Sequence, residues 1–434
     1  MTDNLTDRFI DYLLKLYRSG FPDSAILKAK YCLLDYLGVT MAGAAELRSK
    51  TKAFSDNPHT DIFKEALLNG IHAHQLELDD GHRYGMIHPG ATVISALLPW
   101  VRQEGLTGKD LLAGIIMGYE AAIRLASALQ PNMKDKGYHA TGTCGTIGAA
   151  MGAAFASGYS TDQLKSTLAA ACTSASGILE IIRDGSELKP YNAGQAAANG
   201  LLAATIGKTG LQGPNDMLGG THGFIKVMGG NLKNDFLQEA DSLAIERIYV
   251  KPYAACRHCH PPIEAVQKII SANKISVAEI QSVEVQTYLW AVHLHDHTEI
   301  EGVTSAKMST PFSVAITFVT GKAGIEEFTT ASIQDPEVIA LTKKVKVYKD
   351  EEMTKLVPHK RGALVTAVMR DGQKFSERVD LPKGEPENPL SHEEIKKKFF
   401  SLALYGGKSA RQAHEIITCV EVVEKRFDDL LRMI

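Results

Sequence analysis

Acidic and imidazole side chains are concentrated in one short segment, residues 76–91, with the sequence LELDDGHRYGMIHPGA. The ionisable side chains that could do chemistry there are Glu77, Asp79, Asp80, His82 and His88. A histidine titrates near neutral pH, and a neighbouring carboxylate can fix its tautomer or raise its pKa. The segment therefore predicts a site of proton transfer. A solvated acidic helix end with incidental histidines would have the same composition, so that alternative stays open.

Two later segments add a histidine and a lysine. His139 directly precedes the stretch ATGTCGTIGAA, which is typical of a helix start where free backbone N–H groups favour anions. Lys189 directly precedes Pro190 at the start of a helix made of small residues. His139 could equally belong to a capping loop, and a loop lysine is usually solvated. The local pattern leaves both roles open.

A third segment, KPYAACRHCHPPIEA, combines Lys251 with the ligand-type side chains of Cys256, His258, Cys259 and His260. Cysteine and histidine bind zinc, but the sequence contains no second Cys pair and no distant Cys/His pair at a zinc-finger spacing. A strand-to-helix geometry is also expected to point alternate side chains apart. No βαβ pattern supports a thioredoxin-like redox pair. We therefore expect no metal here, and expect these side chains to pack and to position Lys251.

Motifs for common cofactors and nucleophiles do not occur in the sequence. There is no dinucleotide glycine fingerprint after a strand, no Walker A lysine, no HExxH and no GxSxG elbow. We therefore expect no organic cofactor. The remaining histidines, lysines and acids suit proton abstraction next to a carboxylate, in which cations stabilise the enediolate-like charge while a histidine or an acid moves the proton.

The elements that must hold these residues change in character along the chain. Nearly every segment between residues 7 and 230 has helical periodicity, including 63–78, and the Gly- and Ala-rich helices are expected to pack closely. After residue 243, IERIYVKPY, SVEVQTYLWAV and KVKVYKDEEM are rich in strand formers, and ALVTAVMRDGQKFSERV is a predicted hairpin with its turn at Asp371-Gly372. The chain is helical again from Ser391. The apolar residues expected to pack back onto the first helices are Leu402, Ala413, Ile416, Ile417 and Val420.

A length of 434 residues favours two domains. We predict a mainly α fold with an α+β insertion: a large all-helical domain formed by residues 1–242 and 391–434, and a smaller α+β lid domain formed by residues 243–390. A ligand is expected in the cleft between them.

Composition narrows the class of partner. The net charge of −3 gives no general attraction to nucleic acid or to an anionic membrane. Six scattered cysteines favour reduced thiols and a cytoplasmic location. The N-terminal stretch is acidic and amphipathic, unlike a signal peptide, and the charge-free residues 140–161 are too rich in Gly, Ser and Thr for a membrane span. We expect no membrane partner and a buried helix at 140–161.

Five segments resemble, in the same order, elements of the MmgE/PrpD family. LELDDGH…HPGA resembles the family's DFDDTH…HPGA, and GYHATGTCGTIGAA resembles GFHPTGTxGxxGAA. KPYNAGQAAANGLLAA resembles KxLHAGxAAxxGLLAA, KPYAACRHCHPPIEA resembles KPYPxCRxxHxxIDA, and SAKMSTPFSVA resembles xAKFSxPYSVA. The resemblance covers nearly the whole chain. It implies a helical domain with an α+β lid, usually in a homodimer, acting on a small di- or tricarboxylate without a metal or organic cofactor.

The family includes 2-methylcitrate dehydratase, cis-aconitate decarboxylase and iminodisuccinate epimerase. We expect dehydration first, with decarboxylation or epimerisation as alternatives. The alternative from another functional class is a non-catalytic protein that binds carboxylates. By motif, the family's active-site positions fall on Glu77, Gly81, His88, His139, Lys189 and Lys251.

Two positions depart from the family pattern: Glu77 stands where Asp is usual, and Gly81 where Thr is usual, so a hydroxyl contact to the substrate is expected to be missing. We expect His88 and His139 to be the proton-transfer pair. Two lysines, Lys189 and Lys251, are expected to bind substrate carboxylates and to lower each other's pKa. Further substrate-binding candidates are Asp80, His82 and His260.

Overall fold

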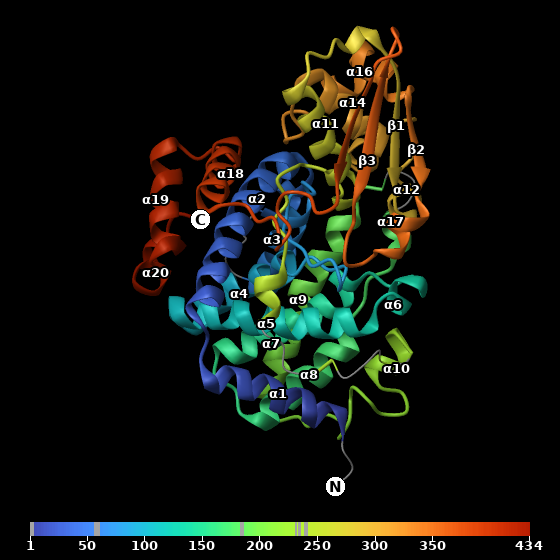
Figure 1. Cartoon of the computed structure of the whole chain (residues 1–434). Coiled ribbons are helices and arrows are strands. Elements are labelled where there is room, and N and C mark those ends of the chain that lie inside the picture. The colour runs from blue at the N-terminus through green and yellow to red at the C-terminus, as the bar shows by residue number, and fades with distance from the viewer. Residues whose placement is uncertain (1–3, 56–60, 183–185, 231, 233–235, 238–241) are drawn as a thin grey trace.

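The computed structural model describes residues 4–55, 61–182, 186–230, 232, 236–237 and 242–434. The first three residues of the predicted N-terminal helix and the residues just before the predicted domain boundary at 243 lie outside this description. A large helical body occupies one end of the molecule (Figure 1). Its helices are α1 (Leu5–Ser19), α2 (Asp23–Ser55), α3 (Ile62–His74), α4 (Gly90–Glu104), α5 (Gly108–Leu129), α6 (Asn132–Asp135), α7 (Ala140–Ala156), α8 (Thr161–Ser174), α9 (Lys189–Lys208) and α10 (Phe224–Met228), with a 3-10 turn η2 at Leu179–Ile182.

Small residues allow the central helices of this body to approach closely. Every residue of α7 is buried. A Cβ added to Gly118 of α5 would lie 2.8 Å from the Gly148 carbonyl oxygen of α7, and a Cβ added to Gly148 would lie 2.8 Å from the Gly118 carbonyl oxygen. Helix α5 is long and apolar enough to cross a membrane, but 83% of its most apolar stretch is buried inside the protein. The predicted buried helix after residue 140 is confirmed as α7.

The second part of the structure is a four-stranded mixed sheet with short helices (Figure 1). The strand order is β2-β1-β3-β4, with β1 parallel to β2 and antiparallel to β3. The predicted hairpin is confirmed: β3 and β4 pair antiparallel, and Gly372 adopts φ +86° in the turn between them. Its elements are η3 (Ala244–Arg247), η4 (Arg257–Cys259), α11 (His260–Ala272), η5 (Val277–Glu279), β1 (Ile280–Thr287), α12 (Leu289–Val292), α13 (Val303–Met308), α14 (Thr310–Thr320), α15 (Thr330–Gln334), α16 (Pro336–Thr342), β2 (Val345–Lys349), α17 (Glu351–Lys355), β3 (Ala363–Met369) and β4 (Lys374–Val379).

The prediction of a strand at IERIYVKPY is wrong. Its first residues form η3, and the rest is irregular apart from one bridge between Tyr249 and Gly81. The Tyr249 N–H donates to the Gly81 carbonyl (2.8 Å), whereas the next N–H, of Val250, donates to the Gly384 carbonyl (3.0 Å). Because the segment pairs with the Gly81 loop at this one bridge only, no ladder extends along it. This segment crosses from the helical body to the sheet-bearing part, and we call it the crossing segment. Its apolar side chains are buried because Ile245 and Ile248 pack in the core of the helical body.

The last helices return to the helical body, as predicted. They are α18 (His392–Tyr405), α19 (Ala410–Glu421) and α20 (Val423–Leu431). Helix α18 packs along α2, and Ala413, Ile416, Ile417 and Val420 join the core of the helical body. Leu402 packs against α2 as well, with its Cβ 3.4 Å from a Cβ added to Gly38, and it belongs to the second apolar core together with Val39 and Ala42 of α2.

Candidate active site

A cavity of about 180 Å³ lies between the helical body and the sheet-bearing part. All four side chains expected to carry the chemistry line it: His88, His139, Lys189 and Lys251. Glu77 lines it as well. Segments more than 170 residues apart along the chain thus meet at one site. The cavity lies where a ligand was expected from the sequence, between the helical part and the sheet-bearing part of the chain.

The segment 76–91 is shaped by contacts that end α3 early. The helix predicted to reach residue 78 ends at His74, and Glu77 adopts a left-handed backbone conformation (φ +54°). Such a conformation is strained for a residue with a side chain, at a cost on the order of 1–3 kcal/mol, and persists only where surrounding contacts hold it. One of these contacts is the buried pair of His74 Nδ1 and Asp79 Oδ2, 2.7 Å apart.

Asp80 anchors the other end of the loop rather than facing the cavity. Its carboxylate accepts hydrogen bonds from the Tyr119 hydroxyl (2.6 Å) and from the Gly90 N–H at the start of α4 (3.0 Å). Burial raises the pKa of Asp80 to about 7, although the Tyr119 hydrogen bond opposes this shift. The side chain ties the loop to two helices, which places the backbone carbonyl of Asp80 against His88.

Glu77 joins the two lysines into one charged cluster. Lys189, the first residue of α9, contacts one carboxylate oxygen of Glu77, and Lys251 Nζ lies 3.1 Å from the other. Lys251 Nζ is also 3.7 Å from Asp79 Oδ1. Burial raises the pKa of Glu77, but the two lysines outweigh it and hold that pKa well below its ordinary value.

The expectation that the lysines lower each other's pKa is wrong for Lys251. Burial lowers the pKa of its ammonium, but Glu77 and Asp79 outweigh burial and raise that pKa above its ordinary value. The reason is that a carboxylate lies between the two ammonium groups, which the residue types alone could not reveal. Lys251 is therefore a fixed cation at neutral pH, suited to binding an anion and not to donating a proton.

The two histidines are held by different partners and present different ring nitrogens. His88 Nδ1–H donates to the backbone carbonyl of Asp80 (2.7 Å), which leaves Nε2 as the nitrogen that can accept a proton. His139 Nδ1 accepts from the side-chain amide of Asn192 (3.1 Å), so its proton resides on Nε2. Burial lowers the pKa of His88 to about 4 and that of His139 well below its ordinary value. Both rings are therefore neutral near pH 7, one an acceptor and one a donor.

Three candidate side chains and Gly81 are not among the residues that line the cavity. His82 Nδ1 accepts from the Gly85 N–H (3.1 Å), and burial lowers its pKa to about 3. His260 is buried beside Arg257, 2.8 Å from its Nη1, and donates from Nε2 to the Ala255 carbonyl (3.1 Å). Asp80 anchors the loop, and Gly81 is covered by the ring of Tyr249.

Several side chains that line the cavity or contact its histidines and acids were not predicted from the sequence. Asn192 lies three residues after Lys189 on α9, so the helical period alone could have indicated its approach to the site. His74 is one turn before the acidic segment. Arg361 and His295 come from irregular segments with no pattern to single them out, and Tyr249 lies in the segment that was predicted as a strand.

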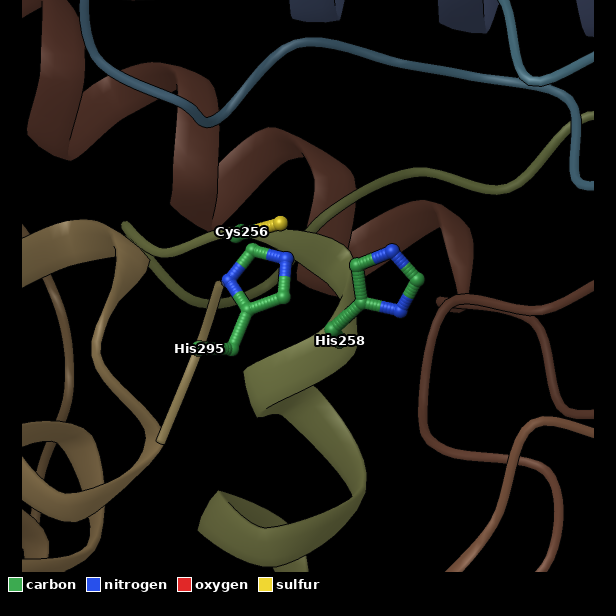
Figure 2. Close-up of side chains that lie close together, drawn as sticks. All are labelled: Cys256, His258 and His295. Atoms are coloured by element: carbon green, nitrogen blue, oxygen red, sulfur yellow. The ribbon is translucent and has the colours of Figure 1, made fainter. Parts of the chain in front are cut away.

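Cys256 and His258 point toward one another, together with His295 (Figure 2). Their ligand-type atoms lie within 4.8 Å of one another. The expectation that alternate side chains would diverge is wrong for this pair, because η4 turns the chain within three residues. Cys259 does diverge, and its Sγ contacts the Met308 carbonyl and the Thr310 hydroxyl.

The chain matches two family models. The model described as MmgE/PrpD N-terminal domain matches residues 7–237, and the MmgE/PrpD C-terminal domain matches residues 253–423. Among curated proteins, the cis-aconitate decarboxylase-like protein oryM of Aspergillus oryzae is 25% identical, over 92% of this chain and 90% of the relative. The cis-aconitate decarboxylases of Aspergillus terreus and Mus musculus are each 24% identical, over 92% of this chain and 89% and 86% of theirs.

Proposed function

Because the chain belongs to the MmgE/PrpD family, we propose that it is a lyase that removes a proton next to a carboxylate of a small di- or tricarboxylate. Dehydration of a substrate of the 2-methylcitrate kind is the first candidate. The observation that carries it is the pair of neutral imidazoles, His88 with an available acceptor and His139 with an available donor. A dehydration needs a base for the C–H proton and a hydrogen-bond donor at the departing hydroxyl.

Charge around the cavity supports a polyanionic substrate. Five cationic side chains line it, whereas Glu77 is the single carboxylate in the described lining. The cations are Lys134, Lys189, Lys251, Arg257 and Arg361. The carboxylate of Glu77 already contacts both Lys189 and Lys251. A substrate carboxylate can compete with Glu77 for the same two ammonium groups. Each charge-assisted contact of this kind is worth roughly 1.5–3 kcal/mol.

The proposed step balances within these side chains. His88 Nε2 takes the proton from the carbon next to a substrate carboxylate, and the electron pair forms the new C=C bond. The hydroxyl on the adjacent carbon accepts a hydrogen bond from His139 Nε2–H and leaves as water with the proton that His88 has taken up. The lysines stabilise the enediolate-like charge that develops on the carboxylate. Both rings are then in their starting protonation states.

Decarboxylation is the second candidate, because the relatives named above are cis-aconitate decarboxylases or similar to them. That reaction needs cations for the carboxylates that remain, and the cavity offers them. The missing side chain at Gly81 supports a change of substrate relative to the family pattern.

The test is turnover of a panel containing 2-methylcitrate, citrate, cis-aconitate and iminodisuccinate, with products identified by NMR. Loss of water from 2-methylcitrate would support the first candidate, and loss of carbon dioxide from cis-aconitate the second. Binding of these acids without turnover by the wild type would contradict the enzymatic proposal and favour a carboxylate-binding protein.

A further inference from the structure

We propose that Cys256, His258 and His295 form a binding site for a zinc ion at the wall of the cavity. The three ligand-type atoms lie within 4.8 Å of one another, and the two imidazole rings are 4.8 Å apart between centroids (Figure 2). Thiolate and imidazole are the donors that zinc prefers, and three protein ligands with one open position are typical of zinc sites that bind a further molecule.

Both imidazoles are already oriented for metal binding. His295 Nδ1–H donates to the Met308 carbonyl (2.7 Å), and His258 Nδ1 hydrogen-bonds with the Tyr288 hydroxyl (2.5 Å). In metal sites, such a contact through one ring nitrogen fixes the tautomer and leaves the other nitrogen for the metal. The contacts leave Nε2 of both rings as the available donors.

The cavity also determines what the fourth ligand would be. Cys256, His258 and His295 line the same cavity as Lys189 and Lys251. These lysines repel a bare dication, which conflicts with zinc binding. An anionic fourth ligand removes this conflict. On the proposed function, that ligand is a substrate carboxylate, so zinc would strengthen substrate binding without entering the proton-transfer step.

The ligand set differs from the one that the sequence suggests. A Cys-x-x-Cys pairing would use Cys256 with Cys259, but Cys259 Sγ faces the Met308 carbonyl and Thr310. His295 is 36 or more positions from either cysteine and becomes a neighbour only through folding. The two alternatives therefore predict opposite results for two single substitutions.

The experiment is equilibrium dialysis of the purified full chain against Zn²⁺ alone, followed by metal analysis. The expected result is one zinc per chain for the wild type and for Cys259→Ser, and at least a tenfold weaker affinity for Cys256→Ser and His295→Ala. Circular dichroism and thermal unfolding establish that each variant is folded. If a ligand variant does not fold, Co²⁺ added to the wild type gives the second readout, a thiolate-to-cobalt charge-transfer band that Cys259→Ser retains.

Several results would overturn the zinc site: no stoichiometric binding by the wild type, undiminished binding by His295→Ala, or loss of binding in Cys259→Ser alone. The carboxylate ligand is tested separately by adding cis-aconitate to the Co²⁺ form, which should change its visible spectrum. An unchanged spectrum would reject the carboxylate as fourth ligand and leave the metal site standing. A failure of the enzymatic proposal would not refute the zinc site, because equilibrium dialysis measures zinc binding without any turnover.

Discussion

The ring of Tyr249 occupies the space that a side chain at position 81 would need. A Cβ added to Gly81 would lie 2.5 Å from Cζ of Tyr249 and would also overlap its hydroxyl oxygen. Tyr249 lines the cavity, and its ring lies beneath the guanidinium of Arg257, 4.6 Å from the ring centroid. The hydroxyl that the family pattern places on residue 81 is thus absent, and a tyrosine hydroxyl from the crossing segment lies in that region.

Gly81→Thr should therefore destabilise the fold, because the new side chain overlaps Tyr249. Overpacking of this kind typically costs about 1–3 kcal/mol. Urea unfolding measures the free energy of unfolding, and the double variant Gly81→Thr/Tyr249→Ala should recover part of the loss. An equal loss in the single and double variants would contradict the steric relationship.

Tyr249→Phe should leave the free energy of unfolding nearly unchanged while altering substrate binding. The substitution keeps the ring over Gly81 and beneath Arg257, and removes only the hydroxyl. We expect KM for the preferred polycarboxylate to rise by about tenfold, equivalent to about 1.4 kcal/mol. An unchanged KM and kcat would show that the hydroxyl does not contact the substrate.

His139→Asn should lower kcat at least about a hundredfold, the usual effect of removing a proton donor or acceptor. The matched control is His414→Asn on the exposed face of α19, which should retain full activity. Steady-state kinetics on the substrate identified in the panel make the comparison. A loss of tenfold or less in folded His139→Asn would mean that the role of His139 at the leaving hydroxyl has been misassigned.

Stability should fall as the pH is lowered from about 6.5 towards about 4. Burial holds the pKa of His82 at about 3 and those of His88 and His295 at about 4. An unfolded histidine has a pKa of about 6.5, so in this window the unfolded chain binds more protons than the folded one and is favoured by acid. Asp80, with its pKa raised to about 7, acts in the opposite direction but is outnumbered.

Urea midpoints measured across that pH range test the direction of this dependence. His82→Asn is the informative variant, since its amide oxygen can still accept from the Gly85 N–H, and it should reduce the slope. A midpoint that does not change, or that rises on acidification, would disagree with neutral buried histidines.

A homodimer is predicted from the family, and α9 offers an apolar face for the partner copy. Tyr191, Leu202 and Ile206 of this helix are 43%, 46% and 39% exposed in the single chain. Leu202→Glu should then yield monomers in sedimentation velocity, whereas Leu404→Glu on α18 should not. A wild type that is monomeric at micromolar concentration would rule out the dimer.

Local pattern determined much of this protein because helices, hairpins and their faces depend on residues close in sequence. The α5 helix, the turn at Gly372 and the small-residue packing of α7 were all predictable, since periodicity and glycine placement act locally. The family resemblance also identified His88, His139, Lys189 and Lys251 as candidate site residues. The structure shows that all four line one cavity.

Only the tertiary structure decided how these groups act. The separation of roles between the two histidines depends on the Asp80 carbonyl and on Asn192, and the pKa of Lys251 depends on Glu77, 174 positions away in the chain. The crossing segment 245–253 resembles a strand in sequence because its apolar side chains are buried, yet it forms one isolated bridge and no strand. Likewise, His295 meets Cys256 and His258 through folding alone. Electrostatics and hydrogen bonding depend on distance in space, and no spacing along the sequence records that distance.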